Sequence, residues 1–256
     1  MIKYKIKKFI LFFIPITGCL LFFWIYPVIV FMDWLNTNGA PSLREEEIFL
    51  NIMGTNGNFI KPNNIFAIFA VIAILSLSFI FMSDKPIMII RLKSRKKYIS
   101  IHLVETLIFS CIFVFLIEMI NVIGAILIFG TDMVIKFKLL EYSLIDYFTL
   151  LLFYFRMGTI LIISCIISNK RIAPFITIAI YIIESLLQNF FLIMERVWTP
   201  NKDAISGIYL LTGNITLIDI IPMIMRSLTI NILLIVFSYY LFDKKDLIEK
   251  KENIST

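Results

Sequence analysis

Residues 84–100, DKPIMIIRLKSRKKYIS, separate two long apolar runs, and this contrast decides the fold. The runs are Ile65–Phe81 before the segment and Leu107–Phe129 after it. A helix needs about 20 apolar residues to cross the hydrocarbon core of a bilayer, and both runs approach or exceed that length. Cations between such runs are typical of a connection at the membrane surface. The sequence therefore predicts two membrane spans joined by a basic segment.

The composition extends this prediction to the whole chain. Of its 256 residues, 60% are hydrophobic and only 16% are charged, whereas soluble domains carry roughly 25% charged residues. The alternating pattern of an outer-membrane barrel strand is absent from the sequence. We therefore expect an all-α, polytopic membrane protein with one transmembrane domain over residues 1–256. The net charge of +6 does not indicate a nucleic-acid partner, because the cations lie mostly at the ends of apolar runs.

Six segments are predicted to span the membrane, and the first is expected to be a retained span because it is too long for a signal peptide. They are residues 9–32, 64–82, 101–129, 147–167, 172–194 and 221–242. Residues 205–218 are also apolar, but they are too short and too interrupted by glycine to cross. We treat them as a candidate re-entrant segment.

The distribution of cations predicts the orientation of these spans. Most of the 24 lysine and arginine residues fall in four places: the N-terminus, residues 84–100, Lys170–Arg171 and the C-terminal tail. Such an excess marks the cytoplasmic side. Both termini are therefore predicted to be cytoplasmic. The lipid bilayer is an expected partner of the chain.

Within residues 84–100, Pro86 can open a short helix because the first helical turn does not use its N–H group. The apolar cluster Ile87–Ile90 precedes the cations, which predicts an amphipathic helix on the membrane surface. The simpler alternative is a basic loop that only fixes the topology.

Four charged residues fall inside predicted spans, where charge is costly and usually faces a partner or a wet cavity: Glu118, Arg156, Glu184 and Arg226. At about 1.5 Å per residue, Arg156 and Glu184 lie roughly 18 Å from the cytoplasmic end, and Glu118 and Arg226 roughly 24–26 Å. The matched depths predict two ion pairs, Arg156–Glu184 and Glu118–Arg226. These residues either hold helices together or line a substrate path.

No catalytic or metal-binding motif is evident in the sequence. Cys19, Cys111 and Cys165 lie in apolar runs, and His102 is the only histidine, so no metal site is expected. His102 and Glu105 are one helical turn apart near the cytosol and are interpreted as an interfacial pair. The motifs HExxH, GxSxG and the Walker lysine motif are absent. The chain is therefore not expected to be an enzyme.

The layout resembles the permease subunit of ABC-2-type ABC transporters, in particular the small bacterial permeases of peptide or bacteriocin export and immunity systems. The resemblance rests on four features: the basic start MIKYKIKK, six spans with both ends inside, the basic segment after the second span, and the glycine-broken segment before the last span.

The resemblance implies that residues 84–100 are a coupling helix that docks on a separate ATPase. The docking residues would be Pro86, Arg91, Lys93, Ser94, Arg95, Lys96, Lys97 and Tyr98. Two ATPase copies and a second permease, identical or different, would complete an exporter in the bacterial cell membrane. This chain would bind no cofactor, and ATP and magnesium would be held by the ATPase. The substrate would be hydrophobic or amphipathic.

The sequence also departs from the family pattern. The first external loop is longer than in compact members, and the N-terminal segment is short for the usual interfacial helix. Two alternatives therefore stay open: a membrane-embedded protease or lipid-modifying enzyme, and the substrate-binding component of an energy-coupling-factor importer.

Overall fold

The computed structural model describes residues 2–37, 45–53, 68–82, 95–192, 203–204, 206–211, 213 and 215–252. Within these ranges the chain is helical and contains no strand. The helices are α1 (Ile2–Thr37), α2 (Glu45–Met53), α3 (Ala70–Met82), α5 (Arg95–Lys136), α6 (Leu139–Ile167), α7 (Ala173–Leu192), α9 (Ser206–Leu211) and α10 (Leu217–Glu252). The predicted all-α class is confirmed.

Four helices are long and apolar enough to cross a membrane: Phe13–Val30, Lys96–Lys136, Leu139–Ile167 and Leu217–Lys244. They contain the predicted spans 101–129, 147–167 and 221–242, and most of the span 9–32. The predicted spans 64–82 and 172–194 correspond to α3 and α7, whose apolar parts Ala70–Phe81 and Ala173–Leu186 are shorter. Residues 64–67 and 193–194 lie outside the described residues. The chain thus has the helices of a membrane protein.

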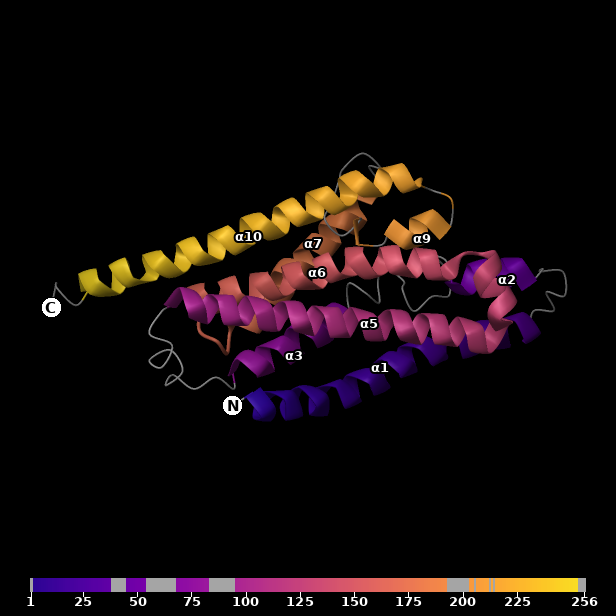
Figure 1. Ribbon diagram of the computed structural model, residues 1–256, viewed down its shortest axis with the longest axis horizontal. Coiled ribbons are helices and arrows are strands. Elements are labelled where there is room, and N and C mark those ends of the chain that lie inside the picture. Colours follow the sequence, from indigo (N-terminus) through magenta and orange to yellow (C-terminus); the bar gives the residue numbers. More distant parts are fainter. Residues whose placement is uncertain are drawn as a thin grey trace.

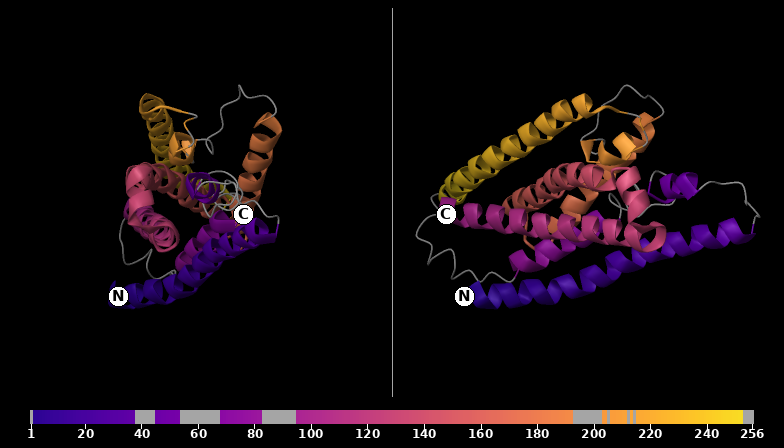
Figure 2. Two further views of the ribbon diagram at one scale, coloured as in Figure 1. Left: turned by 90° about the vertical axis from the view of Figure 1, so that its right-hand side faces the viewer. Right: turned by 45° about the vertical axis from the view of Figure 1, so that its right-hand side comes forward.

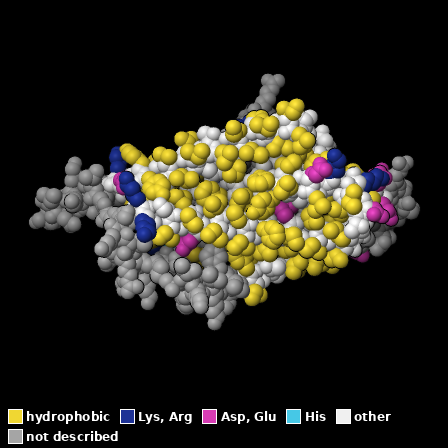
Figure 3. All heavy atoms as spheres, viewed as in Figure 1, with side chains coloured by type: hydrophobic (Ala, Val, Ile, Leu, Met, Phe, Trp, Pro, Cys, Tyr) yellow, Lys and Arg dark blue, Asp and Glu magenta, His cyan; other side chains and the backbone are white. Residues whose placement is uncertain are grey.

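The long helices α1, α5, α6 and α10 run along the longest axis, and the N- and C-termini lie toward the same end (Figure 1). Figure 2 shows α1 and α10 on opposite sides of the bundle. Hydrophobic side chains cover the middle of one face, while Lys, Arg, Asp and Glu gather mostly toward its two ends (Figure 3). This banding is the pattern that a bilayer imposes on a spanning protein.

Helix α6 lies at the centre of the bundle, packed against α3, α5, α7, α9 and α10. In its membrane-spanning window 61% of the residues are buried, against 11% in α10 and 18% in α1. A Cβ atom on Gly158 of α6 would collide with Thr106 of α5. Glycine at this position therefore allows the two helices to approach closely. The outer helices α1 and α10 leave apolar surface for lipid or for another chain.

Helix α5 extends beyond the predicted span at both ends. Its first residue is Arg95, so the last residues of the segment 84–100 form its opening turns. Gly130 has φ 77° and ψ 170°, and the helix is kinked there. Helix α6 then begins at Leu139, directly after Lys138 in a left-handed conformation. Residues 131–146, which lie between the predicted spans 101–129 and 147–167, are therefore helical for most of their length.

Candidate intramembrane polar site

Helix α6 carries a line of buried polar residues along one side. Asp146, Thr149 and Arg156 are 4%, 3% and 5% exposed, respectively. They are spaced by three and seven residues, which places them on one face of a helix. Each lies close to polar groups from outside α6. Helix α6 therefore organises the polar interior of the bundle.

Arg156 forms a two-point ion pair with Glu184 of α7. Its Nη1 donates to Oε1 at 2.9 Å and its Nη2 to Oε2 at 3.0 Å. The guanidinium fork matches the carboxylate in this geometry, which strengthens and orients the contact. The Arg156 guanidinium also lies over the Phe153 ring, 5.4 Å from its centroid. The predicted pair is therefore present, and it joins α6 to α7.

The second predicted pair, Glu118–Arg226, is wrong. Arg226 of α10 instead binds Asp203, with its Nη2 2.8 Å from Oδ1 and its Nε 3.4 Å from Oδ2. The Asp203 side chain is 1% exposed, whereas the Arg226 side chain is 42% exposed. Asp203 lies just before α9, between the predicted spans 172–194 and 221–242. The carboxylate of Asp203, and not that of Glu118, therefore pairs with Arg226.

Helix α9 is held against α6 by backbone and hydroxyl contacts. The Gly207 N–H group donates to Asp146 Oδ1 at 2.6 Å. Thr149 Oγ1 donates to the Ala204 carbonyl at 3.3 Å and accepts from Ser206 Oγ at 3.3 Å. A Cβ atom at position 207 would collide with the Asp146 carboxylate. The described part of the candidate re-entrant segment 205–218 thus includes a short helix docked on polar groups of α6.

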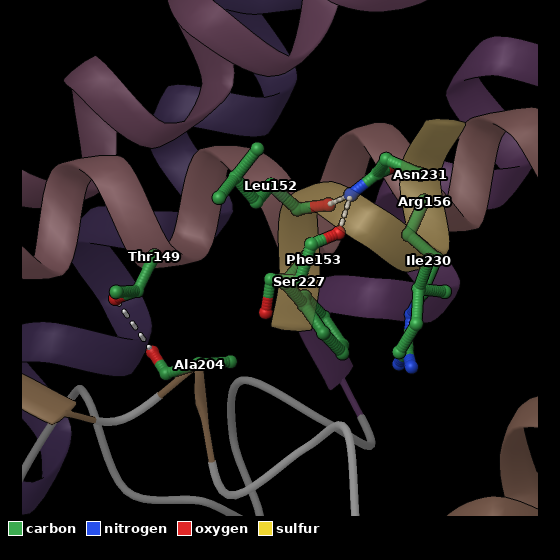
Figure 4. A pocket seen from close by; sticks show the side chains of 8 residues that line it. All are labelled: Thr149, Leu152, Phe153, Arg156, Ala204, Ser227, Ile230 and Asn231. Atoms are coloured by element: carbon green, nitrogen blue, oxygen red, sulfur yellow. Dashed lines mark hydrogen bonds between the residues drawn. The ribbon is translucent and has the colours of Figure 1, made fainter. Parts of the chain in front are cut away.

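A small cavity of about 10 Å³ opens between α6, α10 and Ala204. Figure 4 shows Thr149, Phe153 and Arg156 from α6 around it, together with Ser227 and Asn231 from α10. Asn231 Nδ2 donates to the carbonyls of Leu152 at 3.1 Å and of Ser227 at 2.9 Å. Drug-sized ligands occupy pockets of roughly 300–1,000 Å³. The cavity is therefore far too small for a peptide.

Glu118 lies on α5, facing α6. It is 6% exposed, and Asn121, nearly one turn further along α5, is 3% exposed. Asp146 and Ser143 of α6 both lie close enough to Glu118 to affect its carboxyl group. Among the residues that the structure describes, neither carboxyl oxygen of Glu118 has a hydrogen-bond partner. This half of the bundle thus holds two neighbouring buried acids.

One end of the bundle holds the start of α5, the turn at Lys170 and the C-terminal half of α10, and we call it the basic end. A separate set of contacts joins the helices there. Lys170, in the turn between α6 and α7, donates to Tyr98 OH at 3.2 Å and to the Phe81 carbonyl of α3 at 3.4 Å. Ser100 Oγ and Tyr239 OH of α10 are 2.7 Å apart. The start of α5 therefore contacts α3, the α6–α7 turn and α10 at once.

The structure describes only some of the proposed docking residues. Pro86, Arg91, Lys93 and Ser94 lie outside the described residues, and Arg95 is the first residue of α5. The side chains of Lys96 and Lys97 are exposed at the start of α5, and Lys96 Nζ lies 3.8 Å from Asp243 Oδ2 of α10. Two docking cations therefore point to solvent from a firmly held helix.

The predicted interfacial pair His102–Glu105 is present. His102 Nδ1 lies 3.0 Å from Glu105 Oε2, and the imidazole is buried between the rings of Phe81 and Tyr98. Among the described residues, no group of His, Cys, Asp or Glu side chains could hold a metal ion.

Asp146, Asp203 and Asn231 were missed by the sequence analysis. Asp146 lies one residue before the predicted span 147–167, and Asp203 lies between the predicted spans 172–194 and 221–242. The signal that could have found Asp146 is its spacing from Thr149 and Arg156 on one helical face.

The chain matches no family model, no curated protein and no solved structure in the three comparisons that were made.

Proposed function

We propose that this chain is the membrane permease subunit of an ABC-2-type exporter in a bacterial cell membrane. Its substrate would be hydrophobic or amphipathic, and a peptide or bacteriocin is the class we favour. The observation that carries the proposal is the junction at the basic end, where Tyr98 contacts Lys170, and Ser100 contacts Tyr239. A push on the preceding segment would pass through α5 into three other parts of the bundle.

The orientation follows from the charges. The basic end holds the start of α5, the turn at Lys170 and the C-terminal half of α10, and basic flanks favour the cytosol. Residues 84–100 would then meet a cytosolic ATPase through Arg91–Lys97. ATP binding would close two ATPase copies, and each would move the coupling segment of its permease. The ATPase would supply the catalysis and hold ATP and magnesium.

The substrate path is proposed to lie between two permeases rather than within one. The cavity beside Arg156 has a volume of about 10 Å³, which is far too small for a peptide. The membrane-spanning windows of α1 and α10 are only 18% and 11% buried, so they offer apolar surface to a second permease. The Arg156–Glu184 pair would then hold α6 to α7 while the subunits move.

The membrane-embedded enzyme is less well supported. It requires a reachable polar cluster around Glu118, Glu184 or His102. Glu184 is held by Arg156, and His102 is enclosed by aromatic rings at the basic end. Glu118 and Asp146 are 6% and 4% exposed, which closes them to a substrate.

Affinity purification from native membranes in mild detergent tests the proposal. The tagged chain should bring down an ATPase with Walker motifs, and reversal of Arg91, Lys93, Arg95, Lys96 and Lys97 to glutamate should abolish this. A control variant with Lys244, Lys245, Lys250 and Lys251 reversed keeps the change in charge at the same end but outside the coupling segment. Capture and ATP turnover that survive the first set of changes would contradict the proposal.

A further inference from the structure

Cations from three separate elements meet at the basic end of the bundle. Those with described side chains are Lys96 and Lys97 of α5, Lys170 and Arg171 of the α6–α7 turn, and Lys244 of α10. The acids described at this end are Glu105, which faces His102, and Asp243, which lies 3.8 Å from Lys96. Neither α5 nor α7 has an acidic residue in its first turn. The described part of this end therefore carries an excess of positive charge.

The α6–α7 turn is fixed in place by hydrogen bonds on either side of the peptide unit that leads to Arg171. The Lys170 ammonium group donates to Tyr98 OH at 3.2 Å and to the Phe81 carbonyl at 3.4 Å. The Arg171 N–H group donates to Asn169 Oδ1 at 3.4 Å. The backbone thus presents Arg171 from a defined position.

The Arg171 side chain borders an apolar surface. It is exposed, and among the described residues no acid forms a salt bridge with it. The apolar side chains on either side of it in the sequence are also exposed: Ile167, Ile172 and Phe175 are 67%, 54% and 69% exposed, respectively. An unpaired cation and large apolar groups therefore occur together at the edge of the predicted membrane region.

The helical path of α7 starts within this turn. The Ala173 N–H group donates to the Asn169 carbonyl, four residues back, at 3.0 Å. Arg171 and Phe175 are also four residues apart, a spacing that places two side chains on one helical face. This face therefore offers a guanidinium group and, one turn deeper, an aromatic ring.

An anionic phospholipid has the chemistry that matches this face. A guanidinium fork binds two phosphate oxygens at once, and basic pockets between membrane helices bind acidic headgroups. The acyl chains of the same lipid lie beside the apolar side chains that point into the bilayer. A soluble anion would use the cation but would gain nothing from Ile172 and Phe175.

We propose that the basic end binds an anionic phospholipid of the surrounding bilayer, with the lipid phosphate at Arg171 and Lys170 and an acyl chain along Ile172 and Phe175. An ammonium group has three donors, and the hydrogen bonds of Lys170 within the chain use two of them. The lipid supplies negative charge where the described chain lacks it. The site does not include residues 91–97, so the inference is independent of the proposed ATPase contact.

Thermal unfolding of the full chain in a neutral detergent, titrated with lipid, tests the inference. Phosphatidylglycerol should raise the unfolding temperature until the site is saturated, because a ligand of the folded state stabilises that state. Phosphatidylcholine, which has no net charge, should not. Without lipid, Arg171→Gln should unfold like the wild type. With lipid it should need roughly five- to tenfold more phosphatidylglycerol for half the shift, since one charged contact is lost.

Two control variants locate the site. Lys138→Gln removes an exposed cation at the opposite end and should respond to phosphatidylglycerol like the wild type. Phe175→Ala keeps every charge but should weaken the response, because the acyl chain loses an apolar contact. An unchanged titration of Arg171→Gln, or an equal weakening in Lys138→Gln, would overturn the proposal.

A comparison of additives on the wild-type protein needs no variant and is decisive if a variant fails to fold. Inorganic phosphate, at the same phosphate concentration as the lipid, should leave the unfolding temperature unchanged. A shift as large as that from phosphatidylglycerol would indicate a site for a free anion and would overturn the proposal. Equal shifts from phosphatidylglycerol and phosphatidylcholine would overturn it as well, because the headgroup charge would then have no role.

Discussion

Asp203 and Arg226 are joined by a 2.8 Å contact between Oδ1 and Nη2, which fixes the chain just before α9 to α10. Together with the bond between Gly207 and Asp146, this pair holds the α9 segment between α6 and α10. The same pairing removes Arg226 as a partner for Glu118. One ion pair thus determines both how α9 docks and where an uncompensated acid is left.

Replacing Arg226 by glutamine should lower the free energy of unfolding by about 1–3 kcal/mol, because a buried carboxylate loses its charged partner. The effect should be at the lower end of this range, since the Arg226 side chain is 42% exposed and water screens the pair. Unfolding of the purified protein in detergent measures it. Arg171→Gln, in the exposed α6–α7 turn, is the control and should be neutral. Equal loss in both variants would argue against the pair.

Replacing only Glu184 by glutamine should destabilise the protein by about 3 kcal/mol, because Arg156 then stays buried without its counter-charge. Converting both residues to methionine should recover much of that stability, since a buried ion pair and a packed apolar pair are often equivalent. The comparison uses the unfolding free energies of the two variants. A double variant less stable than the single one would show that the pair contributes more than mutual neutralisation.

Gly207→Ala should loosen α9 and cost about 1–3 kcal/mol, because the added Cβ overlaps the Asp146 carboxylate. Amide hydrogen exchange in Ser206–Leu211 should accelerate. Gly18→Ala is the control, as a Cβ at that position in α1 meets nothing within 4 Å. Unchanged exchange in α9 of the Gly207 variant would count against the docking described above.

A graded series at Tyr98 tests the junction at the basic end. Tyr98→Phe removes the hydroxyl group that accepts the hydrogen bond from Lys170 and should reduce stability by about 1 kcal/mol. Tyr98→Ala also removes the ring packed on His102 and Phe242, and it should uncouple ATP hydrolysis from transport while the ATPase still binds. Transport per ATP hydrolysed, measured in proteoliposomes, checks this. Full coupling in the alanine variant would exclude the junction as the route of force.

The sequence was sufficient for the helical class and for the Arg156–Glu184 pair. The length of an apolar run predicts directly whether a helix can cross a bilayer. The helices around residues 101–129, 147–167 and 221–242 could therefore be located. Arg156 and Glu184 lie in neighbouring spans joined by a short turn. Their equal depth in the membrane was therefore enough to predict that they form a pair.

The Glu118–Arg226 prediction failed because depth alone does not say which acid is nearer. Asp203 lies just before α9, which packs against α6, and hydropathy marks the apolar segment 205–218 but not the acid that precedes it. Asp146 was missed for a related reason. The turn at Phe137–Lys138 is so tight that α6 begins at Leu139 and takes in residues 139–146, which lie before the predicted span 147–167.

The most direct test of the transporter assignment is photo-crosslinking from single positions in native membranes. A photoreactive side chain replaces Lys97, exposed at the basic end, or Lys136, exposed near the opposite end of α5. The account predicts a crosslink from position 97 to a soluble ATPase with Walker motifs, and none from position 136. No crosslink from position 97 to such an ATPase, or equal crosslinking from both positions, would contradict it.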